Sequence, residues 1–136
     1  MASNPLWYDA TVEAAVNAVT ALLNGGSLVI YEGTQPAVDG ALGGTILATM
    51  SFAGTAFGNA TAAAGTVTAT AGTITSGTAS ATGTAQYFAL MTSAGGTVGT
   101  GECGTSGSDL NLNSTAISSG ATVTISSFTI TESQTG

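Results

Sequence analysis

The hydrophobic period of the chain changes at Asn24-Gly25-Gly26, and this change limits the possible folds most strongly. Before it, the larger apolar residues recur every three or four positions, as on one face of a helix, at Val12, Val16, Val19 and Leu23. Asp9 is a candidate N-cap, and the Asn-Gly-Gly triplet is a typical helix stop. We therefore expect an N-terminal arm over residues 1–8 and an amphipathic helix over residues 9–24.

After Gly26 the apolar residues alternate, which indicates strands. The clearest segments are 27–32, 45–52, 66–71, 83–91 and, more weakly, 96–101. Residues 58–85 consist almost entirely of alanine, glycine and threonine, a composition that also suits a flexible linker. We favour short strands there, because threonine is a strand former and residues 66–71 alternate. Bulky residues on both faces of 83–91 predict a central strand.

The C-terminal segment 121–131 carries its apolar residues first at Val123 and Ile125 and then at Phe128 and Ile130. A bulge at Ser126-Ser127 would return all four side chains to one face. The predicted fold is mainly β: an antiparallel β-sandwich or jelly-roll-like domain over residues 27–136, preceded by one N-terminal α-helix. We expect the helix and the sandwich to form one structural unit.

The charge inventory excludes several functions. The chain has no lysine, arginine or histidine, and its seven carboxylates give a formal charge of −7. Without cations it offers nothing to a phosphate backbone, so we expect no nucleic-acid partner. It should be repelled from anionic membranes and steered towards basic protein surfaces. No apolar run is long enough to span a bilayer, and no basic signal-peptide region precedes one, so we expect no membrane partner.

The same inventory argues against catalysis. Without histidine there is no imidazole base, catalytic triad or imidazole metal ligand, and the carboxylates are scattered singly. Cys103 is the only cysteine, and its neighbours offer no cation that would lower its pKa, so we expect a small buried or half-buried side chain rather than a reactive thiolate. We therefore expect neither an enzyme nor a cofactor.

One candidate metal site is the run Asp109-x-Asn111-x-Asn113, which has the spacing of the first ligands of a calcium loop. The match then fails, because Ser114 stands where the loop requires glycine and Gly120 where it requires glutamate. The alternative is a strand whose leucines, Leu110 and Leu112, face the core while the Asp and Asn side chains face outwards. We favour the strand and keep the calcium site as the weaker alternative.

The N-terminal arm contains Leu6, Trp7 and Tyr8, the candidate residues for contact with a partner. Tryptophan and tyrosine are common both in protein interiors and at interfaces. The sequence leaves open whether these side chains cover the protein's own core or dock on another protein.

Several phrases, in this order, resemble a family of small β-rich structural proteins of tailed bacteriophages. They are LVIYEGTQP (28–36), FAGTAFG (52–58), GTAQYF (83–88), GTSGSDLNLN (104–113) with Ile117, and SSFTIT (126–131). The resemblance covers most of the chain after Gly26. Members of this family tend to carry an arginine after the aromatic pair; here Ala89 takes that place, so any role of that cation is absent.

The resemblance implies a virion structural protein, made in the host cytoplasm. The role that fits best is capsid decoration (cement): binding the outer surface of the head, with the major capsid protein as partner, and clamping neighbouring coat subunits. Such proteins often form homotrimers, and the N-terminal arm would anchor this one to the coat. Two alternatives remain: a tail or head-fibre component that binds the host surface, and a calcium-dependent adhesion or self-assembling surface module.

Overall fold

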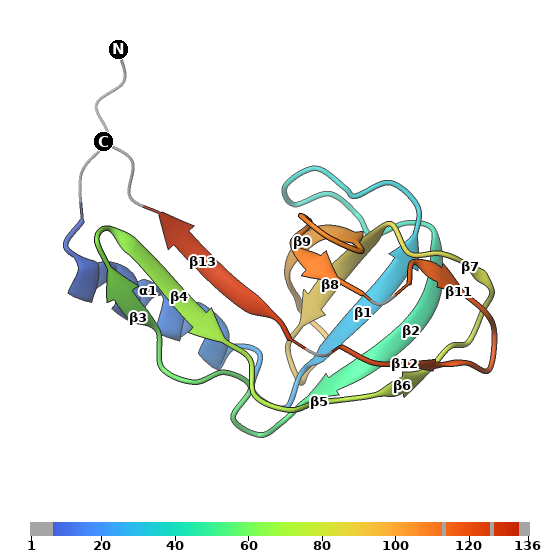
Figure 1. The fold of residues 1–136 in the computed structure, drawn as a ribbon, viewed down its shortest axis with the longest axis horizontal. Coiled ribbons are helices and arrows are strands. Elements are labelled where there is room, and N and C mark those ends of the chain that lie inside the picture. The colour runs from blue at the N-terminus through green and yellow to red at the C-terminus, as the bar shows by residue number, and fades with distance from the viewer. Residues whose placement is uncertain (1–6, 113, 126, 134–136) are drawn as a thin grey trace, which may run out of the picture.

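The computed structural model describes residues 7–112, 114–125 and 127–133, and in this part the chain is mainly β with one N-terminal helix (Figure 1). The helix, α1, spans Asp9–Ala21, and residues 22–25 form a turn in place of the last predicted helical turn. Asp9 was predicted to be the N-cap, but Tyr8 holds that position. Tyr8 makes no side-chain capping hydrogen bond, and Asp9 lies in the first helical turn. No helix in the described residues is long and apolar enough to cross a membrane.

The buried face of α1 differs from the predicted stripe at one position. Val12, Val16 and Leu23 are buried as expected, but Val19 is 41% exposed. Thr20 is buried in its place, and its Oγ1 donates a hydrogen bond of 3.2 Å to the carbonyl oxygen of Asn17. Intrahelical bonding satisfies this hydroxyl, so the helix can turn a threonine to the core and leave a valine outside.

A six-stranded sheet in the order β10-β9-β8-β1-β2-β5 forms the larger part of the molecule (Figure 1). Its neighbours pair antiparallel except β10, which runs parallel to β9. The strands predicted at 27–32 and 45–52 are confirmed, and the weak strand at 96–101 begins and ends later. The bounds are β1 Ser27–Glu32, β2 Thr45–Phe52, β5 Ile74–Thr75, β8 Tyr87–Met91, β9 Thr97–Gly104 and β10 Leu110–Asn111.

A three-stranded sheet in the order β13-β4-β3 packs against α1 at the other end of the molecule (Figure 1). It consists of β3 Thr61–Ala63, β4 Thr66–Thr70 and β13 Thr129–Ser133. Two short pairs complete the fold: β6 Gly77–Thr78 with β12 Thr122–Val123, and β7 Gly83–Thr84 with β11 Ala116–Ile117. The Ala/Gly/Thr-rich segment, residues 58–85, therefore contains short strands, as we expected.

Two predicted strands are each divided between sheets. Residues 83–91 split into β7 and β8, because β7 pairs with β11 while β8 pairs with β1 and β9. Residues 121–131 are not one bulged strand, since β12 pairs with β6 and β13 pairs with β4. The four apolar side chains nevertheless reach one core, as the expected bulge would have allowed. Val123, Ile125 and Phe128 are buried, and Ile130 packs against the same core. Ser126 lies outside the described residues.

One hydrophobic core joins both parts of the molecule, and a smaller one lies on the opposite face of the main sheet. The main core includes Val12 and Val16 of α1 together with residues of both sheets, Phe88 and Leu90 among them. The smaller core contains Val29, Tyr31, Tyr87 and Ala89, with Leu42 and Met91 packed against it. β8 therefore has bulk on both faces, as predicted, and the layers enclose a β-sandwich-like domain.

Candidate functional site

The amino end of α1 exposes two of the predicted contact residues. The side chain of Tyr8 is 84% exposed and that of Trp7 is 56% exposed, while Leu6 lies outside the described residues. The Tyr8 carbonyl oxygen accepts hydrogen bonds from the backbone N–H groups of Thr11 and Val12, at 2.9 and 3.1 Å. Helix initiation thus fixes the backbone of Tyr8, while its ring projects away from the core.

Trp7 lines a mainly apolar groove of about 400 Å³ between α1 and β13. The other lining residues are Val12, Ala15, Val16, Val19, Ile130 and Glu132. Val19 and Leu22, one helical turn apart, are 41% and 54% exposed. Exposed apolar side chains on and directly beside one helix are a typical mark of an interaction surface. We call Trp7, Tyr8, Val19 and Leu22 the helix patch.

Within residues 108–112, the predicted strand is confirmed over Leu110–Asn111, which form β10. Leu110 and Leu112 are buried, at 1% and 4% exposure, and β10 pairs with Cys103 and Gly104 of β9. Asp109 Oδ2 accepts the N–H of Glu102 at 3.0 Å, and Asn111 Oδ1 accepts the N–H of Ser108 at 3.1 Å. These two side chains therefore bind the backbone around the β9–β10 turn.

The third residue of the candidate calcium site, Asn113, lies outside the described residues. Within the part of the chain that the structure describes, no three His, Cys, Asp or Glu side chains gather into a possible metal site. Asp109 and Asn111 each have one oxygen engaged with the backbone, which leaves fewer lone pairs for a cation. The calcium site remains an untested alternative.

Cys103 lies on β9 and is partly buried, as expected. Burial, and secondarily the carboxylate of Asp109, raise the pKa of its thiol from 9.0 to about 12. Both causes disfavour the thiolate, which is the nucleophilic form. The side chain therefore stays protonated at neutral pH and is poorly suited to nucleophilic chemistry.

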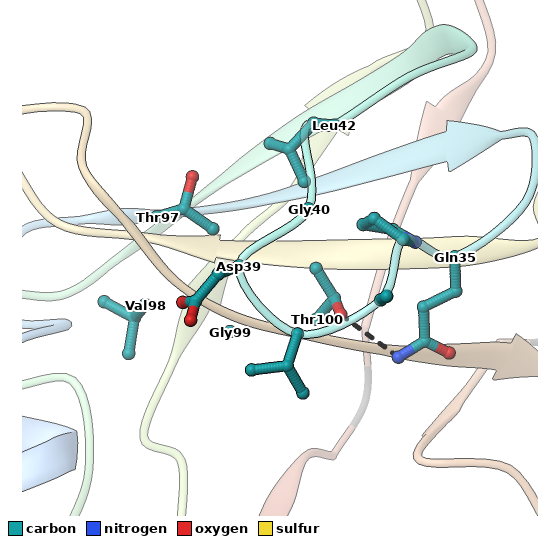
Figure 2. Close-up of a pocket in the computed structure, with 11 residues that line it drawn as sticks. Gln35, Asp39, Gly40, Leu42, Thr97, Val98, Gly99 and Thr100 are labelled. Atoms are coloured by element: carbon teal, nitrogen blue, oxygen red, sulfur yellow. Dashed lines mark hydrogen bonds between the residues drawn. The ribbon is translucent and has the colours of Figure 1, made fainter.

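A second groove, of about 540 Å³, lies between the 33–44 loop and β9, and sequence reasoning gave no sign of it (Figure 2). Gln35 Nε2 donates a 3.1 Å hydrogen bond to Thr100 Oγ1 across the groove. The base of the loop is held by Tyr87, whose hydroxyl donates to the Gly43 carbonyl oxygen at 2.6 Å and accepts from the Gly43 N–H at 3.1 Å. At the tip, Val38 is 93% exposed. The lining has few polar groups that converge on one point, so we assign no ligand to it.

No family model, curated protein or solved structure matches this chain. The class that the fold defines is a mainly β, β-sandwich-like protein with one N-terminal helix, and the described part of the chain exposes several large apolar side chains, Trp7, Tyr8, Leu22 and Val38 among them.

Proposed function

We propose that this protein is a virion structural protein, a capsid decoration (cement) protein that binds the outer surface of a bacteriophage head and clamps neighbouring coat subunits. The observation that carries the proposal is the helix patch: Trp7 and Tyr8 lie exposed just before α1, Val19 is exposed on it, and Leu22 is exposed directly after its last residue. Aromatic anchors with an adjoining apolar groove suit attachment to another protein. The resemblance to structural proteins of tailed bacteriophages supports the virion as the place where this attachment occurs.

The charge of the chain supports attachment outside the head. Its seven carboxylates are not matched by any cation of its own, so the protein would be repelled from packaged DNA and attracted to a basic coat surface. We propose the major capsid protein as the partner and a homotrimer as the bound form. Because the chain has no histidine and Cys103 is protonated, the proposal assigns it a structural rather than a catalytic role.

The test is the copy number of the protein in purified virions. Trypsin has no cleavage site in a chain without lysine and arginine, so the digest needs chymotrypsin or a Glu-specific protease. Decoration predicts hundreds of copies on the head. Its absence from virions would contradict the proposal. A few copies at the tail would instead favour the alternative, a tail or head-fibre component.

Binding of the purified protein to undecorated heads tests the helix patch itself. Trp7→Ala and Tyr8→Ala should each weaken binding by about tenfold or more, as for aromatic anchors at interfaces. The control is Val38→Ala, which shortens a still more exposed apolar side chain on the 33–44 loop. Equal effects of the control and the patch variants would show that attachment does not use this surface.

A further inference from the structure

β13 is an edge strand with one open side. In the described ranges it pairs with β4 only, in the order β13-β4-β3, so its second edge has no strand partner. An open edge presents a row of backbone donors and acceptors that another strand can bind. Many proteins guard such edges with lysine, proline or bulges, and the five residues of β13, Thr-Ile-Thr-Glu-Ser, contain neither lysine nor proline.

The register shows which residues of β13 face the open side. The Ala71 N–H donates to the Phe128 carbonyl oxygen at 2.9 Å, one pair before the ladder that begins at Thr129↔Thr70. In an antiparallel ladder, hydrogen-bonded and non-hydrogen-bonded pairs alternate. The 128↔71 pair is hydrogen-bonded, so the N–H and C=O groups of Thr129 and Thr131 point away from β4.

Two contacts support this assignment. The Thr70 carbonyl oxygen accepts the Gly58 N–H at 3.0 Å and thus faces away from β13. The hydroxyl groups of Thr68 and Thr131 lie 3.4 Å apart, as expected for the closer side chains of a non-hydrogen-bonded pair. The open edge therefore offers the backbone groups of two adjacent outward positions.

The open edge borders a groove of about 550 Å³ that lies between β13 and β9. Apolar side chains line part of this groove, namely Val19, Phe88, Leu90, Val98, Phe128 and Ile130. Two carboxylates, Asp109 and Glu132, also line it. The β9–β13 groove thus combines an unpaired strand edge, an apolar lining and negative charge.

We propose that the β9–β13 groove accepts an extended segment of a different protein, with apolar residues alternating with lysine or arginine, as a strand added to β13. Backbone hydrogen bonds to Thr129 and Thr131 would give affinity, and side-chain contacts would give specificity. This chain has no cation to match Asp109 and Glu132, so the matching charge must come from another protein. The only charged side chains that a second copy could bring to the same groove are carboxylates, and like charges across a strand pair are destabilising.

This inference does not depend on the capsid proposal, because it can be tested with purified protein and a synthetic probe. The probe is a capped eight-residue peptide of alternating valine and lysine. Two matched peptides carry glutamate in place of lysine, or proline at two central positions. In an NMR titration, the alternating peptide should shift the Thr129 and Thr131 amide signals and protect them from hydrogen exchange, and the two matched peptides should bind at least about tenfold more weakly.

Variants locate the site. Glu132→Gln and Asp109→Asn should each weaken binding about two- to fivefold, the usual effect of one surface ion pair. The charge-matched control, Asp39→Asn on the 33–44 loop, should leave binding unchanged. Asparagine is a suitable replacement because it tolerates the left-handed backbone of residue 39, whose φ is 62°. Thr131→Pro removes an N–H group that points away from β4, and edge strands tolerate proline at such positions. Because the bound peptide would lose this hydrogen bond, the variant should bind it about tenfold more weakly.

Three results would overturn the proposal. Equal binding of the proline peptide would show attraction by charge without strand pairing. An equal loss in Asp39→Asn would show that the net charge, rather than the groove, binds the peptide. Protection of the Thr129 and Thr131 amides in the free protein would mean that a second copy or another part of this chain already covers the edge.

Discussion

Replacing Phe128 with alanine should weaken the core that joins the two parts of the molecule. Its buried ring lies 5.5 Å from the ring of Phe88 on β8, at an interplanar angle of 86°, and 5.9 Å from the ring of Phe57, at 63°. Phe57 in turn lies 5.8 Å from Phe52. The four rings thus connect the main sheet with the segments that lead into the three-stranded sheet.

The expected cost of Phe128→Ala follows from this packing. Truncating a buried phenylalanine to alanine costs about 3–5 kcal/mol, which includes the loss of its edge-to-face contacts. Domains of this kind are stable by roughly 5–15 kcal/mol, so the variant should lose a large part of its free energy of unfolding. For a chain of this length the melting temperature should fall by roughly 10–20 °C. Phe128→Leu, which keeps most of the volume, should cost about 1–2 kcal/mol.

Urea denaturation with two probes tests this reasoning. Far-UV circular dichroism reports on the sheets, and fluorescence of Trp7, the only tryptophan, reports on the neighbourhood of α1. Because one core joins both parts, the two transitions should coincide in the wild-type protein. Tyr8→Ala, at an exposed aromatic residue, is the control and should change stability by less than about 0.5 kcal/mol.

Two outcomes would refute the argument. A loss below about 1 kcal/mol in Phe128→Ala would mean that the ring cluster does not contribute as its burial indicates. Separate transitions in the wild-type protein would mean that the helix with its three-stranded sheet unfolds independently, against the single unit that we predict.

Three further predictions concern the loop, the thiol and the metal. Tyr87→Phe removes both hydrogen bonds to Gly43 and should destabilise the protein by about 1–2 kcal/mol in urea titration. The loss is no larger because Gly43 is exposed and water can replace the lost partner. A neutral effect would show that other contacts hold the loop. The raised pKa of Cys103 means that the folded state resists ionisation of the thiol, so the free energy of unfolding should fall as pH rises from 9.0 towards about 12, and Cys103→Ala should fall less over the same range. If the two proteins show the same pH profile, the thiol is not the cause. Calcium and EDTA should leave Tm unchanged, because Asp109 and Asn111 already accept backbone hydrogen bonds; a calcium-dependent rise in Tm would instead favour the metal site.

Local patterns were sufficient for several elements. The three- and four-residue spacing predicted the helix, and the apolar stretches after Gly26 predicted β1 and β2 with their bounds. Leu110 and Leu112 are buried as their alternate spacing predicted, because side chains two positions apart in an extended segment lie on the same face. These features depend on neighbours in sequence, which a single sequence displays.

Other features depended on non-local pairing. Nothing in the local pattern of 83–91 shows that β7 pairs with β11 while β8 joins the main sheet. The same holds for the division of 121–131 between β12 and β13. The exposure of Val19 could not be predicted from the sequence either. One helical turn can turn either Val19 or Thr20 to the core, and the elements that pack against the helix determine which of the two is buried.

By itself, the sequence determined the chemistry available to this protein: seven carboxylates, no lysine, arginine or histidine, and one cysteine, hence no ion pair between its side chains. The tertiary structure decided where that chemistry lies. It placed residues 98–101 and 129–132 around one groove, which Asp109 and Glu132 also line, and within the described ranges it left one edge of β13 without a strand partner. The physical reason is that composition fixes which interactions a chain can make, whereas strand order and register fix which groups remain unpaired at a surface.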